Sequence, residues 1–239
     1  VALGKNPRQF GGVDSVAKLE ALIGDDGRIG GDMDTFVSHL LGLLALGSVQ
    51  RPAPAASLAY VRQAQQQDGG WAWDGTTATA ADTNPTAFAI RALIAVGEPK
   101  DSATVAKALT YIRSIQNDDG GWPYQNPSPY GTATDANSTA VTIQAILAAG
   151  QDPAAAAWTS SAGNTPLSAL EALQNDSGAF AWQAAMADDN LLATVQALPA
   201  LAGKAFPLAT MDVGEAVSPP MTMPQTGAAG LDPVLPLLL

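Results

Sequence analysis

The stretch that decides the fold of this chain reads Gln116-Asn117-Asp118-Asp119-Gly120-Gly121-Trp122. An apolar run with helical spacing leads into it, and the glycines then interrupt that run. Glycine tolerates the left-handed backbone conformation that closes a helix, which most other residues resist. The stretch therefore predicts a helix that ends near Gln116, a tight turn, and an aromatic side chain with a structural role.

The pattern Gln-x-x-x-Gly-x-aromatic occurs three times, with a degenerate earlier copy at Ile23, Gly27 and Ile29. Its three complete copies are Gln65, Gly69 and Trp71; Gln116, Gly120 and Trp122; and Gln174, Gly178 and Phe180. Two further landmarks keep the same register: a glycine that closes an Ala/Leu-rich run, and an aspartate fifteen positions earlier. These pairs are Asp32 and Gly47, Asp82 and Gly97, Asp135 and Gly150, and Asp188 and Gly203. The spacing predicts four repeats of about 50 residues.

Each repeat is predicted to be a hairpin of two helices. Asn84-Pro85 indicates the start of the second helix, because asparagine caps a helix and proline suits its first position. The equivalent predicted caps are Asp34, Asn137 and Asn190. Stacked hairpins of this kind bury each face against a neighbour, so we expect an all-α repeat fold.

The predicted domain organisation follows from the same landmarks. Residues 1–10 match the tail of a second helix, and we expect them to be the remainder of a partial unit. Together with the four complete units they form one predicted repeat domain over residues 1–207. Residues 208–239 carry five prolines without a helical period, which predicts a Pro-rich linker.

Composition excludes several kinds of chemistry. The chain has 239 residues, no cysteine, one histidine and a net charge of −11. It therefore has no thiol nucleophile, no disulfide and no Cys/His zinc site, and we expect no metal and no cofactor. His39 falls within a predicted helix and is expected in the core or at a helix interface. Strong acidity argues against a nucleic-acid partner, whose phosphates require clustered Lys and Arg.

Residues 116–122 resemble the QW motif of the prenyltransferase/squalene oxidase repeat, found in the terpenoid cyclase/protein prenyltransferase superfamily. Asp135-Ala136-Asn137-Ser138-Thr139-Ala140 lies where that superfamily begins an inner helix. The resemblance covers residues 1–207 and implies an α/α toroid, in which inner helices form a barrel and outer helices carry the QW motifs. Six hairpins usually close such a toroid, so the four visible units imply an incomplete ring.

The resemblance also makes a test for catalysis possible. Class II terpene cyclases protonate their substrate with the middle aspartate of Asp-x-Asp-Asp-Thr-Ala. Alignment on that motif places Asn84, Asn137 and Asn190 at the donor position, and an amide cannot supply the proton. Unit one retains Asp34, but Thr35 follows it. The leading hypothesis is a non-catalytic domain for binding or structural spacing; a terpene-cyclase fragment whose acid lies upstream and a corrinoid-like carrier are the alternatives.

Two groups of residues are candidate ligand contacts, and the partner is expected to be a small molecule, a glycan or another protein. The aromatic side chains in the loops after the motifs are Trp73, Tyr124, Tyr130 and Trp182. The acidic side chains before the second helices are Asp82, Asp135 and Asp188. The alternative is structural, since the aromatics can pack the loops and aspartate stabilises a helix N-terminus. Arg91 and Gln144 share a repeat position and are expected to line the barrel or an inter-helix seam.

The tail contains Met223-Pro224-Gln225-Thr226-Gly227, which is similar to the Leu-Pro-x-Thr-Gly sortase signal. The match, together with a low content of charged residues (14%), predicts an extracellular bacterial surface protein anchored to the cell wall. The alternative for this segment is a Pro-rich linker without a signal.

Overall fold

The computed structural model describes residues 1–30 and 35–214, and the protein is mostly helical. The inner helices are α2 (Phe36–Ser48), α4 (Thr83–Ala95), α6 (Ala136–Ala148) and α8 (Leu191–Leu201). The outer helices are α1 (Ser15–Glu20), α3 (Ala55–Gln63), α5 (Ala103–Ser114) and α7 (Pro166–Glu171), with short 3-10 turns η1 (Phe10–Gly12) and η2 (Ala156–Trp158). Units one to four are the successive outer–inner pairs. Among the described residues no helix is long and apolar enough to cross a membrane.

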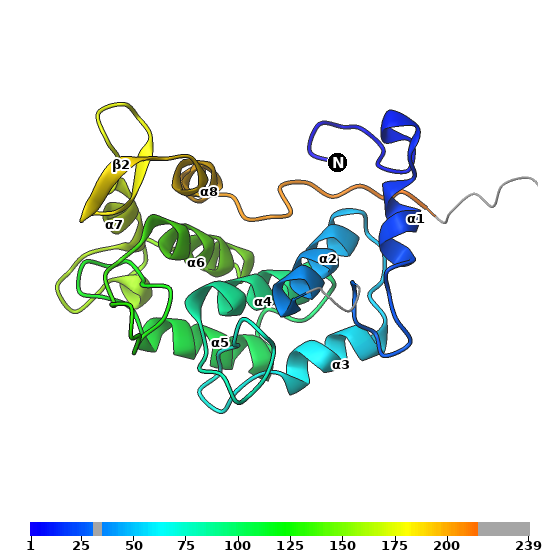
Figure 1. Ribbon diagram of the computed structural model, residues 1–239, viewed down its shortest axis with the longest axis horizontal. Helices are drawn as coiled ribbons and strands as arrows, with labels where there is room; N and C mark the ends of the chain where they lie inside the picture. Colours follow the sequence, from blue (N-terminus) through cyan, green and yellow to red (C-terminus); the bar gives the residue numbers. More distant parts are fainter. Residues whose placement is uncertain (31–34, 215–239) are drawn as a thin grey trace, which may run out of the picture.

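The inner helices lie side by side in a curved row, α2 against α4, α4 against α6, and α6 against α8 (Figure 1). Small residues allow this close packing: Ala87, Ala89 and Ala92 of α4 are all fully buried. Gly47 shows how close the helices come, because a Cβ atom there would lie 2.5 Å from the carbonyl oxygen of Ala95. The row therefore has an apolar interior built largely from alanine, glycine and branched aliphatic side chains.

The end of unit one lies three residues later than the sequence predicted. Gly47 does not close α2, which continues to Ser48, and the left-handed residue after the helix is Gln50, with φ of 54°. Gly47 is needed instead for close contact with α4. The other three predicted closing glycines do adopt positive φ directly after their helices: Gly97, Gly150 and Gly203.

The starts of the inner helices also differ from the prediction. Asp82 and Asp135 are the capping residues of α4 and α6, two positions before Asn84 and Asn137. The Asp82 carboxylate accepts a hydrogen bond from the backbone N–H of Asn84 at 2.8 Å. Each capping aspartate is extended and its backbone N–H is bonded to the motif tryptophan, so the helix can begin only after it. In unit four Asn190 is the cap, as predicted. In unit one the cap of α2 is Thr35, one residue after the predicted Asp34, which itself lies outside the described residues.

An all-α fold was the expectation, but unit four contains a small antiparallel hairpin. Its strands are β1 (Phe180–Gln183) and β2 (Met186–Asn190), with Phe180 paired to Asn190. The matching loop of unit three contains Pro123, Pro127 and Pro129, which lack the N–H donors that a strand pair needs. Unit four has no proline in this segment, and its two arms pair with one irregularity between Ala181 and Gln183.

Residues 203–214 form a strap that leaves α8 and crosses the open side of the row to unit one (Figure 1). The N–H of Phe206 donates to the Gln144 side chain at 3.4 Å, and the N–H of Met211 donates to the Ser48 carbonyl at 2.9 Å. The domain boundary expected at Pro207 falls within this segment, which contacts α6 and α2.

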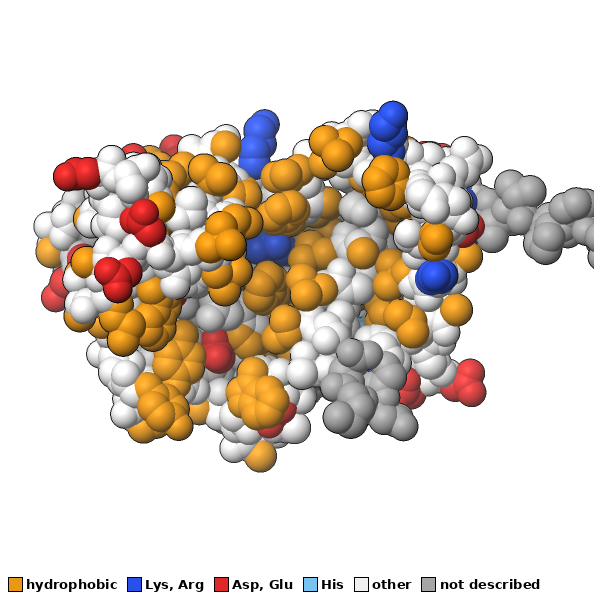
Figure 2. Space-filling model, turned by 45° about the horizontal axis from the view of Figure 1, so that its top comes forward, with side chains coloured by type: hydrophobic (Ala, Val, Ile, Leu, Met, Phe, Trp, Pro, Cys, Tyr) orange, Lys and Arg blue, Asp and Glu red, His pale blue; other side chains and the backbone are white. Residues whose placement is uncertain are grey.

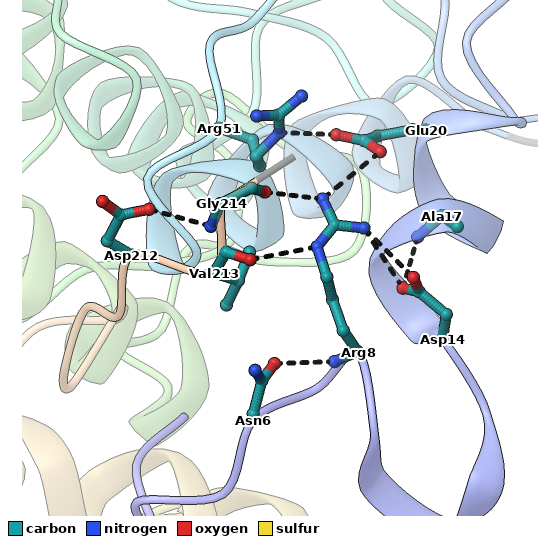
Figure 3. A network of polar contacts seen from close by, with 9 residues as sticks. All are labelled: Asn6, Arg8, Asp14, Ala17, Glu20, Arg51, Asp212, Val213 and Gly214. Atoms are coloured by element: carbon teal, nitrogen blue, oxygen red, sulfur yellow. Dashed lines mark hydrogen bonds and ion pairs between the residues drawn. The ribbon is translucent and has the colours of Figure 1, made fainter. Parts of the chain in front are cut away.

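Arg8 holds the far end of the strap (Figure 3). Its guanidinium donates to the carbonyl oxygens of Val213 at 3.3 Å and Gly214 at 2.9 Å, and it pairs with Asp14 at 3.1 Å. Glu20 joins the network and also accepts from Arg51 at 2.6 Å. The Arg8 side chain is only 6% exposed, so this network fixes the strap at a largely buried point.

Candidate functional site

The motif of unit three ties this unit to the next one. Trp122 is fully buried, and its indole N–H donates to the carbonyl oxygen of Ile112 at 2.8 Å. The Gln116 amide donates to the Gly120 carbonyl at 2.8 Å and to the Trp158 carbonyl of η2 at 2.9 Å. One glutamine therefore closes its own turn and holds the segment that leads into unit four.

Unit two repeats these contacts almost atom for atom. The Trp71 indole donates to the Val61 carbonyl at 2.7 Å. The Gln65 amide donates at 2.9 Å both to Gly69 and to Thr104, which lies at the start of α5. In unit four Gln174 donates to the Gly178 carbonyl at 3.0 Å, and no second acceptor bonds it within the described part of the chain.

A polar side chain on each inner helix accepts a hydrogen bond from the backbone N–H of the motif aromatic. These acceptors are Thr86 for Trp71, Thr139 for Trp122 and Thr194 for Phe180. In unit one His39 takes this place and accepts from the N–H of Ile29 at 3.0 Å through Nδ1. His39 therefore matches Thr86, and Thr35 rather than Asp32 matches Asp82.

His39 is a structural residue, as expected from its position in a helix. It is 2% exposed, and its Nε2 lies 3.2 Å from the Ser57 carbonyl oxygen, so both ring nitrogens are engaged within the protein. Burial is the largest influence on its pKa, which is lowered, so the ring is neutral near pH 7. Because both ring nitrogens are hydrogen-bonded within the protein, neither is free to bind a ligand.

The concave side of the row of inner helices holds a cavity of about 460 Å³. It is lined by Leu41, Leu44, Ala45, Ser48, Phe88, Arg91, Val141, Gln144, Val195, Gln196, Phe206 and Pro207. All four inner helices contribute, and the strap supplies the last two residues. Figure 2 shows hydrophobic side chains gathered around a hollow on this face, with a basic side chain inside it. The volume falls within the range of small-molecule sites, about 300–1,000 Å³.

Arg91 is the one charged residue of this lining. It is only 3% exposed, and burial lowers its pKa to about 10, so the guanidinium remains positive at neutral pH. The Phe88 ring lies 5.1 Å from its central carbon and the Phe206 ring 5.8 Å. No hydrogen bond or ion pair reaches Arg91 from the residues that the structure describes. The cavity therefore combines apolar walls with an uncompensated positive charge.

Comparison with known proteins shows the family of the chain. A family model described as the squalene-hopene cyclase C-terminal domain matches residues 31–190. The chain belongs to this family. It is also similar to the drimenyl diphosphate synthase of Streptantibioticus cattleyicolor, with 27% identity over 164 residues. The match covers 61% of this chain and 30% of the length of that relative.

In this squalene-hopene cyclase C-terminal domain, the structure corrects the alignment of the donor position. Thr35, Asp82, Asp135 and Asn190 are the matching first residues, since each caps its inner helix. The donor position two residues later is occupied by Val37, Asn84, Asn137 and Leu192. The predicted alignment of unit four on Asp188 is thus two residues early, and that of unit one on Asp32 three residues early. Neither correction places an acid at the donor position.

The donor positions lie on the helix faces that form the cavity. On α4, Asn84 precedes Phe88 by four residues and Arg91 by seven, which is the spacing of one helical face. On α6, Asn137 stands in the same relation to Val141 and Gln144. Any side chain at these positions of the cyclase-like domain therefore belongs to the face that carries the cavity lining.

The capping carboxyl groups of Asp82 and Asp135 have raised pKa values because they are buried. Burial, opposed by the hydrogen bond from Asn84 and reinforced by the charge of Asp135, raises the pKa of Asp82 to about 7. Burial also raises the pKa of Asp135, although its hydrogen bonds with Ser138 oppose the shift. Both carboxyl groups point to the first turn of their own helices, and neither lines the cavity.

The seven predicted ligand contacts do not meet in this cavity. Trp73 and Tyr130 lie on surface loops and are 55% and 87% exposed, and Asp188 is exposed on β2. Tyr124 and Trp182 are half-buried. Their role in binding stays a prediction, as does that of Asp82 and Asp135. Across residues 1–30 and 35–214, no group of three or more His, Asp or Glu side chains is placed to hold a metal ion.

The sequence marked only two of the cavity residues, Arg91 and Gln144, through their shared repeat position. Half of the other ten lining residues are leucine, valine or alanine, which are common throughout the chain. Only the curvature of the row and the path of the strap distinguish them from core residues.

Proposed function

We propose that this chain is a non-catalytic domain of the cyclase family that binds a small apolar molecule on the concave face of its inner helices. One observation carries the proposal: all four donor positions, Val37, Asn84, Asn137 and Leu192, lack an acid, while an apolar cavity is present on the concave side of the same helices. General acid catalysis requires a group that holds and releases a proton near the working pH. Alkyl and amide side chains have no such proton.

Arg91 supports the same proposal from the cavity side. Cyclisation that begins with protonation of an alkene builds positive charge on the substrate. A guanidinium without a counter-ion in an apolar cavity repels such a charge, since few dipoles screen it there. The cavity is therefore better suited to hold a ligand than to stabilise a carbocation.

We infer that the curved row is part of an α/α toroid, with residues 1–207 as the repeat domain. The packing of each inner helix on the next and the outer position of α3 and α5 support this arrangement (Figure 1). We also propose an extracellular, surface-anchored location, although residues 223–227 lie outside the described part of the chain. Cleavage of the full chain by sortase between Thr226 and Gly227 tests the anchor, and an uncleaved chain would contradict it.

Two measurements test the binding proposal together. Isothermal titration calorimetry with dodecan-1-ol is expected to show saturable binding to the purified protein. Ala45→Trp places an indole at the cavity wall and is expected to weaken binding at least tenfold. Ala184→Trp, in the exposed turn between β1 and β2, is the matched control and leaves binding unchanged. Incubation with squalene, followed by mass spectrometry, is expected to return squalene unchanged; a cyclised product would overturn the non-catalytic assignment.

The raised pKa of Asp82 favours a second candidate, a terpene synthase that uses this aspartate as its acid. A carboxyl group with a pKa of about 7 is half protonated at neutral pH, which suits a proton donor. The similarity to a drimenyl diphosphate synthase agrees with this candidate. A cyclised product that appears with the native protein and disappears in Asp82→Asn would establish it.

A further inference from the structure

The cavity contains a charge without a partner. Burying a guanidinium is unfavourable unless an anion or well-placed acceptors compensate its charge. Arg91 receives two aromatic faces, from Phe88 and Phe206, but its Nε has no hydrogen-bond partner among the described residues. The aromatic rings stabilise the charge in part, and the buried Nε–H is left without an acceptor among the described residues.

The polar neighbours of Arg91 in the cavity are already engaged with other groups. Gln144 donates to the Gln196 carbonyl at 3.4 Å and accepts from the N–H of Phe206 at 3.4 Å. The Ser48 hydroxyl donates to the Ala45 carbonyl at 2.7 Å. No Asp or Glu lines the cavity in the described structure. The missing acceptor for Arg91 must therefore come from outside these residues.

We propose that the ligand of this cavity is an amphiphile with one carboxylate, which pairs with Arg91 while its aliphatic body lies along the apolar walls. This inference rests on the proposed function, because it names the class of ligand bound at the same site. The planar guanidinium offers two parallel N–H groups that match the two oxygens of a carboxylate. The walls that receive the aliphatic body include Leu41, Leu44, Val141 and Val195.

Charge matching selects a carboxylate over a diphosphate. A diphosphate carries more than one negative charge and needs several cations or a metal to be buried, whereas Arg91 is the one cation of the lining. A single positive charge in an apolar cavity is neutralised by a single negative charge. This ligand would therefore differ from the diphosphate named for the relative.

The test compares three ligands of equal chain length by isothermal titration calorimetry, below their micelle concentrations: dodecanoate, dodecan-1-ol and dodecyl phosphate. Dodecanoate is expected to bind at least tenfold more tightly than dodecan-1-ol. Arg91→Met keeps an unbranched apolar side chain at this position and removes the charge. In this variant the preference for dodecanoate is expected to disappear while dodecan-1-ol still binds.

Each outcome has one consequence. Equal affinity of the native protein for dodecanoate and dodecan-1-ol overturns the carboxylate inference and leaves the apolar-ligand proposal standing. Tighter binding of dodecyl phosphate than of dodecanoate overturns the choice of a carboxylate. Binding of none of the three ligands overturns the proposed function itself. The comparison on the native protein holds even if Arg91→Met fails to fold, and circular dichroism of that variant shows whether it has folded.

Discussion

Units three and four carry the same motif, but of these two only the motif of unit three contacts a following hairpin. Gln116 bonds both its own turn and the next unit, whereas Gln174 bonds its own turn. A Cβ atom on Gly120 would lie 2.6 Å from the Thr165 carbonyl oxygen, whereas one on Gly178 would meet nothing within 4 Å. The difference shows that each motif has two separable functions, to close its own turn and to hold the neighbouring unit.

The last inner helix shows the same difference. α4 and α6 are buried on most sides, whereas α8 exposes Leu191 by 80%, Leu192 by 61% and Leu198 by 58%. Beyond α8 the strap, rather than another described hairpin, continues across the open side to Arg8. The interior units are thus stabilised from both sides, and unit four mainly from one.

The largest change in the free energy of unfolding is expected from the titration of Asp82, the cap of α4. The folded protein holds the proton of Asp82 more tightly than the unfolded chain does, since the pKa rises from 3.8 to about 7. The resulting stability is complete below about pH 4, decreases as the pH rises, and is lost above about pH 7. At about 1.4 kcal/mol per pKa unit, the free energy of unfolding is expected to fall by about 4 kcal/mol over this range.

Chemical denaturation of Asp82→Asn between pH 4 and pH 8 checks this prediction. Asparagine still caps the helix but has no acidic proton. The decrease in the free energy of unfolding with rising pH should therefore largely disappear in this variant. Asn190→Asp introduces the carboxylate at the half-buried cap of unit four and is expected to leave the pH profile unchanged. A native protein whose stability does not vary from pH 4 to pH 7 would contradict the assignment.

The next effect concerns the motif glycines. Both Gly120 and Gly178 have positive φ, which alanine adopts less readily than glycine. Either alanine variant is therefore expected to lose about 1 kcal/mol of stability from backbone strain. Gly120→Ala also forces its methyl group against the backbone of unit four, and we expect about 3 kcal/mol in total. Urea denaturation measures the difference between the two variants; equal losses would show that the contact between units three and four is not tight.

A smaller effect is expected from the glutamines. Gln116→Ala removes two hydrogen bonds, including the one to the Trp158 carbonyl, and is expected to cost about 1.5 kcal/mol. Gln174→Ala removes one exposed bond and is expected to cost about 0.5 kcal/mol. If Gln174→Ala costs as much as Gln116→Ala in urea denaturation, the motif acts only within its own turn.

The smallest effect on overall stability is expected from the strap. Arg8→Lys keeps the positive charge, but a lysine ammonium group cannot reproduce the hydrogen bonds of the guanidinium to Val213, Gly214 and Asp14. We expect a loss of about 1 kcal/mol or less, together with faster hydrogen exchange in residues 203–214. Unchanged exchange in this segment would show that Arg8 does not hold the strap.

The sequence predicted the repeats well because their turns depend on local chemistry. The motif glycines and glutamines are recognisable at fixed spacing, and their turns form within a few residues. Unit one misled the prediction, because Gly47 resembles a closing glycine but serves contact with α4, a property of tertiary packing. Asp188 keeps the repeat spacing of Asp82 and Asp135, but it is not their structural equivalent, because Asn190 caps α8.

The cavity was less predictable than the repeats. Its walls come from four helices and a strap that lie far apart in the sequence, and many of the lining residues are ordinary aliphatic ones. Arg91 was noticeable only by its repeat position. Its burial without a partner depends on how α2, α6 and α8 surround it, which no local pattern indicates.

A crystal structure of the protein with dodecanoate tests the central claim most directly. We expect the aliphatic chain in the cavity between the inner helices and the strap, with the carboxylate about 2.8 Å from the guanidinium nitrogens of Arg91. A ligand bound elsewhere on the protein, or one in the cavity with its carboxylate turned away from Arg91, would contradict the account.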